Sequence, residues 1–423
     1  MLEKKLMLAV VVILLAFASI PAAVLAQDDG GLPPTYDEFV GAVQNSIEDG
    51  TVDELWQEVV ASGEMPIIYT NRVIFMHEAE ADSVAWASEF LGMSFATFTP
   101  YQLEGTRLGE SNIWMAEVVL PYDGRFNYSL VVDGEVIMRD PLAQYQQLEG
   151  AGYISSIYMP GYVYPEATIP RDDIGTGVLS EDIMLSSENL ERDVNVRIYT
   201  PVGYDQLSDL PVVYTSDGND YWHDEMGSLV TILDNLIADG RINPVIVAFV
   251  DARDVVTGEN LRMNELAARD PFAMFVTEEL IPYVDENYKT DSSREARVIL
   301  GTSLGGAMAL HIGLNYSDWF GNLAVQSPFM MFFSPEVVPG YQALEEPLPL
   351  KVFMNQGTYD LDMVNTRLLR DVFVEDDYEL RYVETNNQHG WSNWPALLDE
   401  MLIYFFGTEG AEGSVPPFTT IGD

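Results

Sequence analysis

The sequence predicts an α/β fold, in which a mostly parallel sheet is covered by helices on both faces and is preceded by a small all-β sandwich. From about residue 177 onward, short apolar runs alternate with segments of helical spacing, which is typical of a parallel sheet between helices. Residues 67–138 instead carry short alternating stretches separated by turns, which indicates a sandwich of antiparallel strands. Within 298–310, a β-branched strand leads through a glycine-flanked serine directly into a helix-forming segment.

Composition narrows the class of protein. The chain has 423 residues and 48% hydrophobic content, which is enough for two or three domains with proper cores. Its formal net charge of −47 would repel nucleic acid and anionic lipid, and we interpret it as a solubilising acidic shell suited to a salty environment. Because there is no cysteine, disulfides, thiolate zinc sites and thiol nucleophiles are excluded.

The first 26 residues are typical of a secretory signal. Lys4 and Lys5 precede an apolar run over 6–20, and small residues follow up to Ala26, after which we expect cleavage. The mature protein is then secreted or extracytoplasmic, without stable membrane insertion. The alternative is an uncleaved anchor, because residues 6–26 are barely long enough to span a bilayer.

The predicted domains follow in order. Residues 27–62 form a linker and two short helices, 63–143 the β-sandwich, 144–176 a connecting segment, 177–407 the α/β domain and 408–423 a flexible tail. The expected strands of the sandwich are 72–76, 83–87, 113–120, 126–132 and 135–138. The expected strands of the α/β domain are 194–199, 212–215, 245–250, 298–300, 322–326, 352–355 and 380–384. The expected helices of that domain are 228–238, 272–287, 305–314, 365–373 and 391–406.

Ser303 lies on a turn typical of a nucleophile elbow. Gly301 and Gly305 flank it, because strand and helix approach closely there and leave no room for bulky side chains. The helix that follows points backbone N–H groups at the reacting oxygen. This strand, turn and helix predict an α/β-hydrolase domain with Ser303 as the nucleophile.

A serine hydroxyl needs a base to take its proton, and four histidines are available. His77 lies in the predicted sandwich, His223 precedes the elbow, and His311 lies on the elbow's own helix. His389 remains, in a polar loop after the last predicted strand, where an imidazole can reach over the carboxyl edge of the sheet. We therefore predict His389 as the base.

The orienting carboxylate should follow a strand between the serine and the histidine, which favours Asp360, with Asp362 as the alternative. The oxyanion hole should combine the backbone N–H of Leu304 with a second N–H after the strand 212–215, from Gly218 or Asn219.

Four motifs in this order resemble the esterase family that contains enterobactin esterase, feruloyl esterases and S-formylglutathione hydrolase. They are Val213-Tyr214-Thr215-Ser216-Asp217-Gly218, Arg262-Met263-Asn264-Glu265-Leu266, Gly301-Thr302-Ser303-Leu304-Gly305-Gly306 and His389-Gly390-Trp391-Ser392-Asn393-Trp394. The likeness covers about 177–406. It implies the same roles for Ser303, Asp360 and His389 as the residue patterns do.

The upstream segment resembles the early-set, immunoglobulin-like domain that precedes the esterase domain in the enterobactin-esterase branch. The resemblance is carried by Val84-Ala85-Trp86, Trp114, Phe126-Asn127-Tyr128, Asp133-Gly134-Glu135 and Asp140-Pro141. The family's usual turn Asp-Phe-Asn-Gly-Trp is replaced here by Glu89-Phe90-Leu91-Gly92-Met93. We expect this domain to shape one rim of the substrate pocket.

Tyr221, Trp222 and Phe329 follow strands whose ends should border the site, so they are candidates for an aromatic-accepting pocket; ordinary core packing is the alternative for the run 329–333.

The predicted activity is serine carboxylic-ester hydrolysis without metal or cofactor, on small-molecule or carbohydrate esters, acyl or feruloyl ones above all. A polyanionic siderophore trilactone is a less favoured substrate because of the acidic charge. A non-catalytic exported binding protein with a hydrolase fold is the alternative of another class. The oligomeric state is left open.

Overall fold

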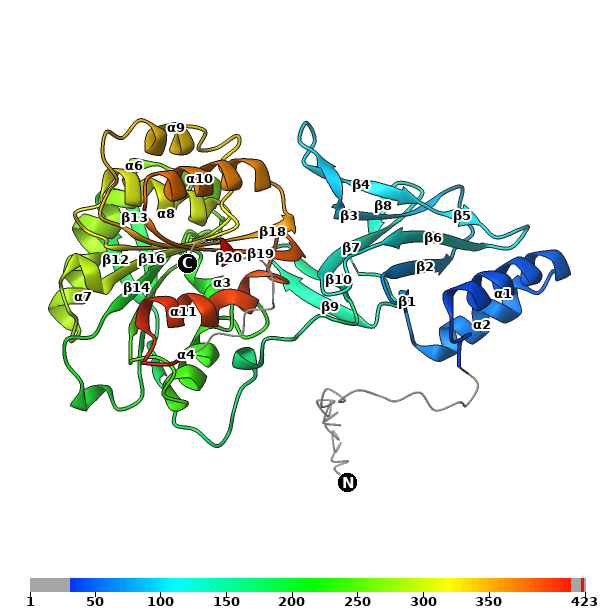
Figure 1. Ribbon diagram of the computed structural model, residues 1–423, viewed down its shortest axis with the longest axis horizontal. Helices are drawn as coiled ribbons and strands as arrows, with labels where there is room; N and C mark the ends of the chain where they lie inside the picture. Colours follow the sequence, from blue (N-terminus) through cyan, green and yellow to red (C-terminus); the bar gives the residue numbers. More distant parts are fainter. Residues whose placement is uncertain (1–30, 138, 412–419, 422–423) are drawn as a thin grey trace, which may run out of the picture.

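The computed structural model describes residues 31–411, apart from residue 138, and residues 420–421; the predicted signal lies outside them. The chain forms an N-terminal β-sandwich with two helices and a larger α/β domain beside it (Figure 1). One sheet of the sandwich has the order β1-β2-β6-β5, with β1 (Ile67–Tyr69), β2 (Arg72–Glu78), β5 (Thr106–Arg107) and β6 (Ile113–Val119). The other contains β3 (Val84–Ser94), β4 (Thr99–Glu104), β7 (Arg125–Val132) and β8 (Glu135–Ile137).

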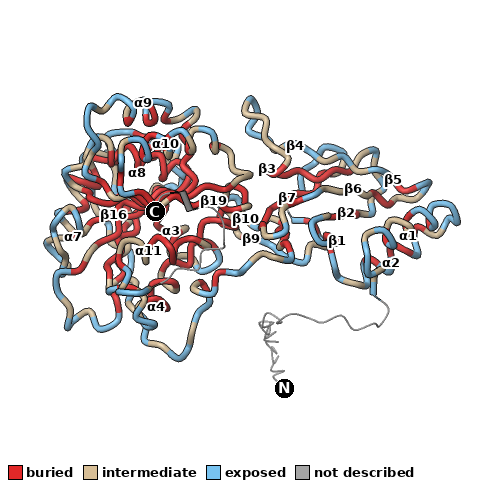
Figure 2. Tube along the Cα trace, in the orientation of Figure 1, coloured by how far each residue is buried: buried red, intermediate tan, exposed pale blue. Residues whose placement is uncertain are grey.

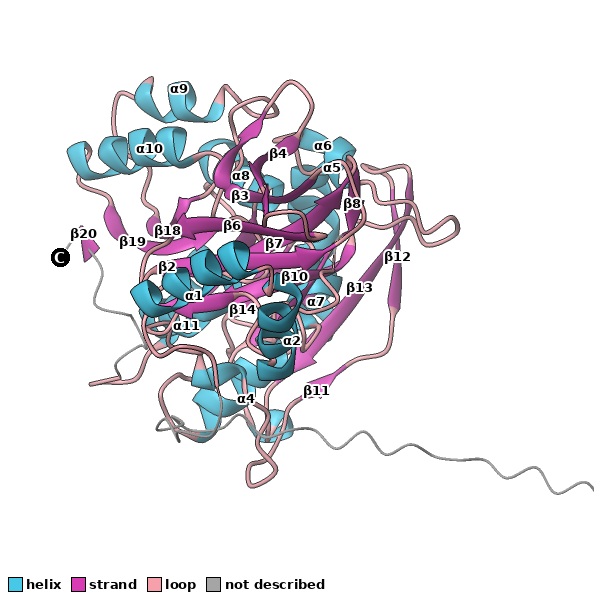
Figure 3. Cartoon of the chain, turned by 90° about the vertical axis from the view of Figure 1, so that its right-hand side faces the viewer, coloured by secondary structure: helices cyan, strands magenta, loops and turns pink. Residues whose placement is uncertain are grey.

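The two sheets of the sandwich enclose a core of their own. Phe75 on β2 stacks on Trp86 of β3, with ring centroids 5.4 Å apart, and meets Tyr128 of β7 edge to face. A second apolar cluster joins the helices α1 (Tyr36–Asp49) and α2 (Val52–Ser62) to β1, β2 and β6. These helices therefore cover the outer face of the first sheet, as the view from that end of the molecule shows (Figure 3).

The segment 144–176, expected as a connection, contains two further strands. β9 (Tyr145–Glu149) and β10 (Gly152–Tyr158) form a hairpin, and β10 pairs antiparallel with β7. Gln, Ser and two glycines make this stretch look like a linker, but its polar residues Gln147, Ser155 and Ser156 are buried where the hairpin packs. The sandwich therefore extends to Tyr158.

The α/β domain is built on one twisted sheet with the order β11-β13-β15-β14-β16-β17-β18-β19. The pairs from β15 to β19 are parallel, whereas β13 pairs antiparallel with β15 and with the edge strands. Its strands are β11 (Val178–Leu179), β12 (Ile183–Ser187), β13 (Arg192–Thr200), β14 (Val212–Thr215), β15 (Ile246–Val250), β16 (Arg297–Thr302), β17 (Asn322–Gln326), β18 (Lys351–Tyr359) and β19 (Glu379–Gln388).

Helices cover both faces of this sheet, which confirms the predicted α/β architecture. One face carries α4 (Leu229–Ala238) and α11 (Leu398–Phe406); the other carries α6 (Asp270–Met274), α7 (Ile281–Asn287), α8 (Leu304–Asn315), α9 (Val337–Gln342) and α10 (Met363–Glu375). The short helices α3 (Gly218–Trp222) and α5 (Arg262–Glu265) lie in loops at the carboxyl edge. The central strands are buried along their whole length (Figure 2), which explains their continuous apolar runs.

The sandwich and the α/β domain meet at the end of β19. Asn387 bridges Arg125 of β7, and the Asn387 side chain accepts the backbone N–H of Arg125 at 2.8 Å. At the other end of the chain, β20 (Thr420–Ile421) pairs with β19, so part of the predicted tail joins the sheet. Within the part of the chain that the structure describes, no helix has the length and apolarity needed to cross a bilayer.

Candidate active site

Ser303 occupies a sharp turn between β16 and α8. Its backbone has φ 58° and ψ −119°, a conformation in the left-handed half of the map that costs energy for a serine. A Cβ on Gly301 would collide with the carbonyl oxygen of Gly305, and a Cβ on Gly305 would collide with the Ser216 hydroxyl. Both positions therefore require glycine, and the turn holds the Ser303 side chain at the carboxyl edge of the sheet.

The structure brings Ser303, His389 and Asp360 into one hydrogen-bonded chain. His389 Nε2 lies 2.8 Å from Ser303 Oγ, and His389 Nδ1 lies 2.6 Å from Asp360 Oδ1. Each of the three follows the last residue of a strand, β16, β18 or β19, and the carboxyl ends of these parallel strands share one edge. Asp362 instead accepts the backbone N–H groups of Met330 and Met331, both at 2.7 Å.

The surroundings of His389 tune its basicity. Burial works against protonation of the imidazole, but the charge and hydrogen bond of Asp360, with the charge of Glu89, raise the pKa of His389 above its ordinary value. Phe329 and Trp394 contact the ring edge to face, with centroids 6.4 and 5.0 Å away. The ring is thus held in place by apolar neighbours as well as by Asp360.

A cavity of about 580 Å³ opens beside Ser303. Its apolar lining includes Phe98, Phe329, Phe333 and Leu361, together with Trp391 and Trp394. Phe98 comes from the tip between β3 and β4, and this tip also packs on the α/β domain through Phe95 and Phe332. The sandwich domain therefore reaches over to the cavity, as expected.

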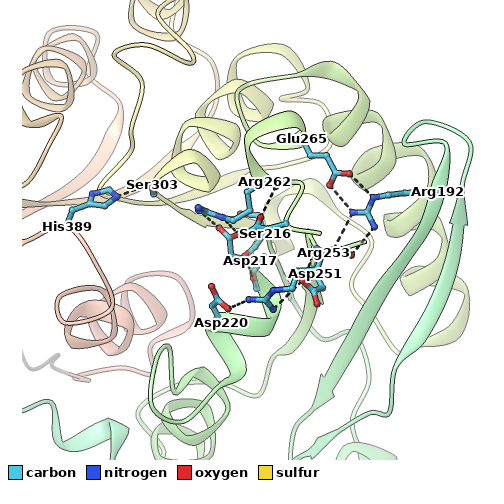
Figure 4. Close-up of polar contacts among 12 residues, drawn as sticks. Arg192, Ser216, Asp217, Asp220, Asp251, Arg253, Arg262, Glu265, Ser303 and His389 are labelled. Carbon is cyan, nitrogen blue, oxygen red and sulfur yellow. Dashed lines mark hydrogen bonds and ion pairs between the residues drawn. The ribbon is translucent and has the colours of Figure 1, made fainter. Parts of the chain in front are cut away.

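Two ion pairs, drawn in Figure 4, also line the cavity. Arg262 binds Asp217 through two nitrogens, and Arg253 Nη2 lies 2.9 Å from Asp220 Oδ1. Arg253 also lies 3.7 Å from Asp251. Each arginine therefore already has a carboxylate partner, so this part of the cavity presents no uncompensated positive charge.

Two more carboxyl groups enter the cavity from the sandwich. Glu149 on β9 accepts the backbone N–H of Trp391 at 3.1 Å, and burial raises the pKa of its carboxyl to about 7. Burial likewise raises the pKa of Glu89 on β3 to about 7, although the nearby His389 and its backbone N–H lower it. The sandwich thus contacts the histidine loop directly and adds acidic groups to the cavity.

Four of the predicted site residues lie elsewhere. Gly218 is packed against the backbone of Phe249 and Val250, and neither it nor Asn219 lines the cavity; the residue before them, Asp217, does. Tyr221 is fully buried, and its hydroxyl donates to Gln326 at 2.9 Å.

Trp222 packs away from the cavity, under the Arg197 guanidinium. The cause is the helix α3, which begins immediately after Asp217: of its residues 218–222, Asp220 alone lines the cavity. Phe329, by contrast, lines the cavity, and so does Leu304, the expected oxyanion donor.

The residue patterns gave no prediction for the acidic and amide groups of the sandwich that line the cavity. The only signal was the acidic Glu89 next to the apolar run that begins β3. No group of three His, Asp or Glu side chains within the described ranges is placed to hold a metal ion.

The match to a family of esterases places the chain among the carboxylic ester hydrolases, and its fold is of the α/β type. It belongs to the esterase family described as "Putative esterase", whose model matches residues 187–405, about half of the chain.

Three comparisons illustrate the likeness. An uncharacterized protein, YjcH, of Bacillus subtilis is 25% identical over 237 residues, which span 53% of this chain and 96% of the relative. An endo-1,4-beta-xylanase/feruloyl esterase of Xylanibacter ruminicola is 28% identical over 51% of this chain, but the match covers only 30% of that protein. The crystal structure of a ferric enterobactin esterase from Salmonella typhimurium superimposes with a TM-score of 0.64 and 18% identity, covering 79% of this chain and 93% of that chain. The likeness to the Salmonella typhimurium structure extends beyond the α/β domain, and at 18% identity it shows similarity of fold alone.

Proposed function

We propose that this protein is an exported serine carboxylic-ester hydrolase that acts on neutral acyl or feruloyl esters of carbohydrate type. The observation that carries the proposal is the chain of hydrogen bonds from Ser303 through His389 to Asp360 at the mouth of a partly aromatic cavity. The apolar N-terminal segment supports export. The two-sheet core around Trp86 supports an early-set, immunoglobulin-like assignment for the sandwich.

The proposed reaction has two halves. Ser303 Oγ attacks the ester carbonyl while His389 Nε2 takes the proton of the Ser303 hydroxyl, and Asp360 stabilises the imidazolium that forms. The imidazolium then protonates the leaving alcohol, which leaves an acyl group on Ser303. In the second half, water gives its proton to His389 and attacks the acyl group, so that the acid is released and Ser303 regains its proton.

The oxyanion of each tetrahedral intermediate needs backbone donors. Leu304 is the first residue of α8, so its N–H has no acceptor within the helix and is available beside Ser303. As the second donor we infer Asp217, because it is the residue of the loop after β14 that reaches the cavity. The ion pair with Arg262 engages the Asp217 side chain, so the donor that we infer is the backbone N–H.

The cavity supports a neutral substrate. Its aromatic side can contact the ring of a feruloyl group, while its arginines are neutralised by aspartates and Glu89 and Glu149 add negative charge. A polyanionic trilactone would meet both these groups and the net charge of −47.

The test is hydrolysis of p-nitrophenyl acetate, methyl ferulate and enterobactin by the mature protein, in low and in molar salt. We expect turnover of the two neutral esters at both salt concentrations. Slow enterobactin cleavage should rise with salt, because screening weakens the repulsion. Rapid cleavage of enterobactin with no turnover of the neutral esters would overturn the proposed substrate class.

The pH dependence of kcat/KM tests the role of His389. The base acts in its neutral form, so activity is lost as the pH falls through its pKa, and we expect the midpoint of this acidic limb above the ordinary value of about 6.5. Glu89→Gln removes a negative charge that favours the imidazolium, and should shift the midpoint to lower pH. Glu104→Gln, an exposed carboxyl on β4, is the control and should leave it in place. An unshifted midpoint in Glu89→Gln would contradict this assignment.

A further inference from the structure

Two acceptor oxygens of the sandwich are buried next to the substrate cavity without a partner. Glu89 Oε2 and Asn127 Oδ1 have no hydrogen-bond donor among the described residues, and both side chains line the cavity. Asn127 is only 2% exposed. Buried polar atoms are rarely left unsatisfied, because each costs about 1–3 kcal/mol of desolvation. These two oxygens therefore point to a group that is supplied by a bound molecule.

The arrangement around these oxygens is fixed by other hydrogen bonds. The Asn127 amide nitrogen donates to Glu149 Oε1 at 2.9 Å, which leaves its carbonyl oxygen as the free atom. Ser88 Oγ donates to the backbone carbonyl of Asn127 at 2.6 Å, so the segments that carry Glu89 and Asn127 lie side by side. The backbone N–H of Asn127 donates to Gln388 at 3.0 Å, next to His389. The free oxygens thus lie among groups that hydrogen bonds hold in place, and not on a flexible surface.

The chemistry of the site selects the kind of group it can bind. Asn127 Oδ1 is an acceptor, and Glu89 Oε2 accepts when ionised and can donate when protonated, so a hydroxyl group, which both donates and accepts, satisfies either state. An anion is disfavoured beside Glu89 and Glu149. A polyhydroxyl group supplies two donors without bringing a second charge that would have to be desolvated. Hydroxyl groups of a sugar or of another polyol meet these requirements.

We propose that Glu89 and Asn127 form a hydroxyl-recognition site, by which the N-terminal sandwich selects esters with a polyol group over plain alkyl esters. The proposal rests on the proposed esterase function and adds the residues that determine its specificity. Glu89 accepts one hydroxyl through Oε2, and Asn127 accepts a second through Oδ1. The sandwich thereby acts as a substrate-binding element of the active site.

The test compares glyceryl ferulate with propyl ferulate, which differ only in two hydroxyl groups. Binding is measured on the full-length mature Ser303→Ala protein by quenching of tryptophan fluorescence, because Trp391 and Trp394 line the cavity. We expect glyceryl ferulate to bind about tenfold more tightly, which is the effect of one hydrogen bond to a charged group. Adding Glu89→Leu should reduce this ratio severalfold, to the preference that Asn127 supports alone. Glu89→Gln, which keeps a carbonyl acceptor, should retain most of it.

Glu104→Leu is the matched control, since Glu104 is an exposed carboxyl of the same sandwich and should leave the ratio unchanged. Thermal unfolding of each variant shows whether it is folded. Equal affinities for the two esters in the parent, an unchanged ratio in Glu89→Leu, or no binding of either ester would each overturn the proposal. Ser303-dependent turnover of p-nitrophenyl acetate by the otherwise unmodified protein tests the esterase function separately, because that ester carries no hydroxyl group.

Discussion

Ser303→Ala is expected to lower kcat for p-nitrophenyl acetate by about a millionfold, which is the loss seen when the nucleophile of a triad is removed. Alanine leaves His389 and Asp360 hydrogen-bonded to each other but without an atom to attack the carbonyl. The remaining rate over water would come from the oxyanion donors and from binding. Initial rates at saturating substrate measure the effect, with thermal unfolding as the check on folding.

Ser327→Ala provides the matched control. Ser327 also lies directly after a buried strand, is fully buried, and has a positive φ of 44°, but it does not line the cavity. Its variant should keep the activity of the parent. Activity that survived in Ser303→Ala and was lost in Ser327→Ala would mean that the wrong strand end had been assigned to the chemistry.

The α/β architecture was predictable from the sequence because its strands are buried on both faces and read as apolar runs. The elbow was predictable for a local reason: a Cβ on Gly301 would collide with the helix backbone at Gly305, and a Cβ on Gly305 would collide with the Ser216 side chain. The order of Ser303, Asp360 and His389 along the chain then follows from their positions after β16, β18 and β19. These features depend on short stretches of sequence.

The parts of the site that the sequence does not predict depend on contacts between segments far apart along the chain. Asn127 and Glu149 reach the histidine loop only because β7 meets β19, about 260 residues further along the chain. The hairpin β9–β10 reads as a linker in the sequence because its buried polar positions are Gln and Ser rather than apolar residues. Tyr221 and Trp222 were misplaced because the direction of a short helix after a strand is set by packing, which sequence patterns do not show.

Asp360→Asn is expected to lower kcat by about 10⁴-fold, which is the effect of the same change in a serine protease triad. The carboxylate accepts the Nδ1 proton of His389 at 2.6 Å, which leaves Nε2 free to take the proton of Ser303. An amide can donate to Nδ1 instead, so it favours the tautomer that carries its proton on Nε2. It also removes the charge that stabilises the imidazolium, so the acidic limb of the pH profile should move to lower pH.

Asp362→Asn is the matched control that separates this catalytic role from a structural one. The two aspartates are two residues apart, and both are almost fully buried. Asp362 accepts two backbone N–H groups of the loop after β17 and the Asn365 amide, with no contact to His389. Its variant should lose about 1–3 kcal/mol of unfolding free energy, and its kcat should fall far less than that of Asp360→Asn. The reverse pattern, with activity lost at Asp362 and retained at Asp360, would assign the orienting carboxylate to Asp362. Chemical denaturation and initial rates on the same preparations distinguish the two outcomes.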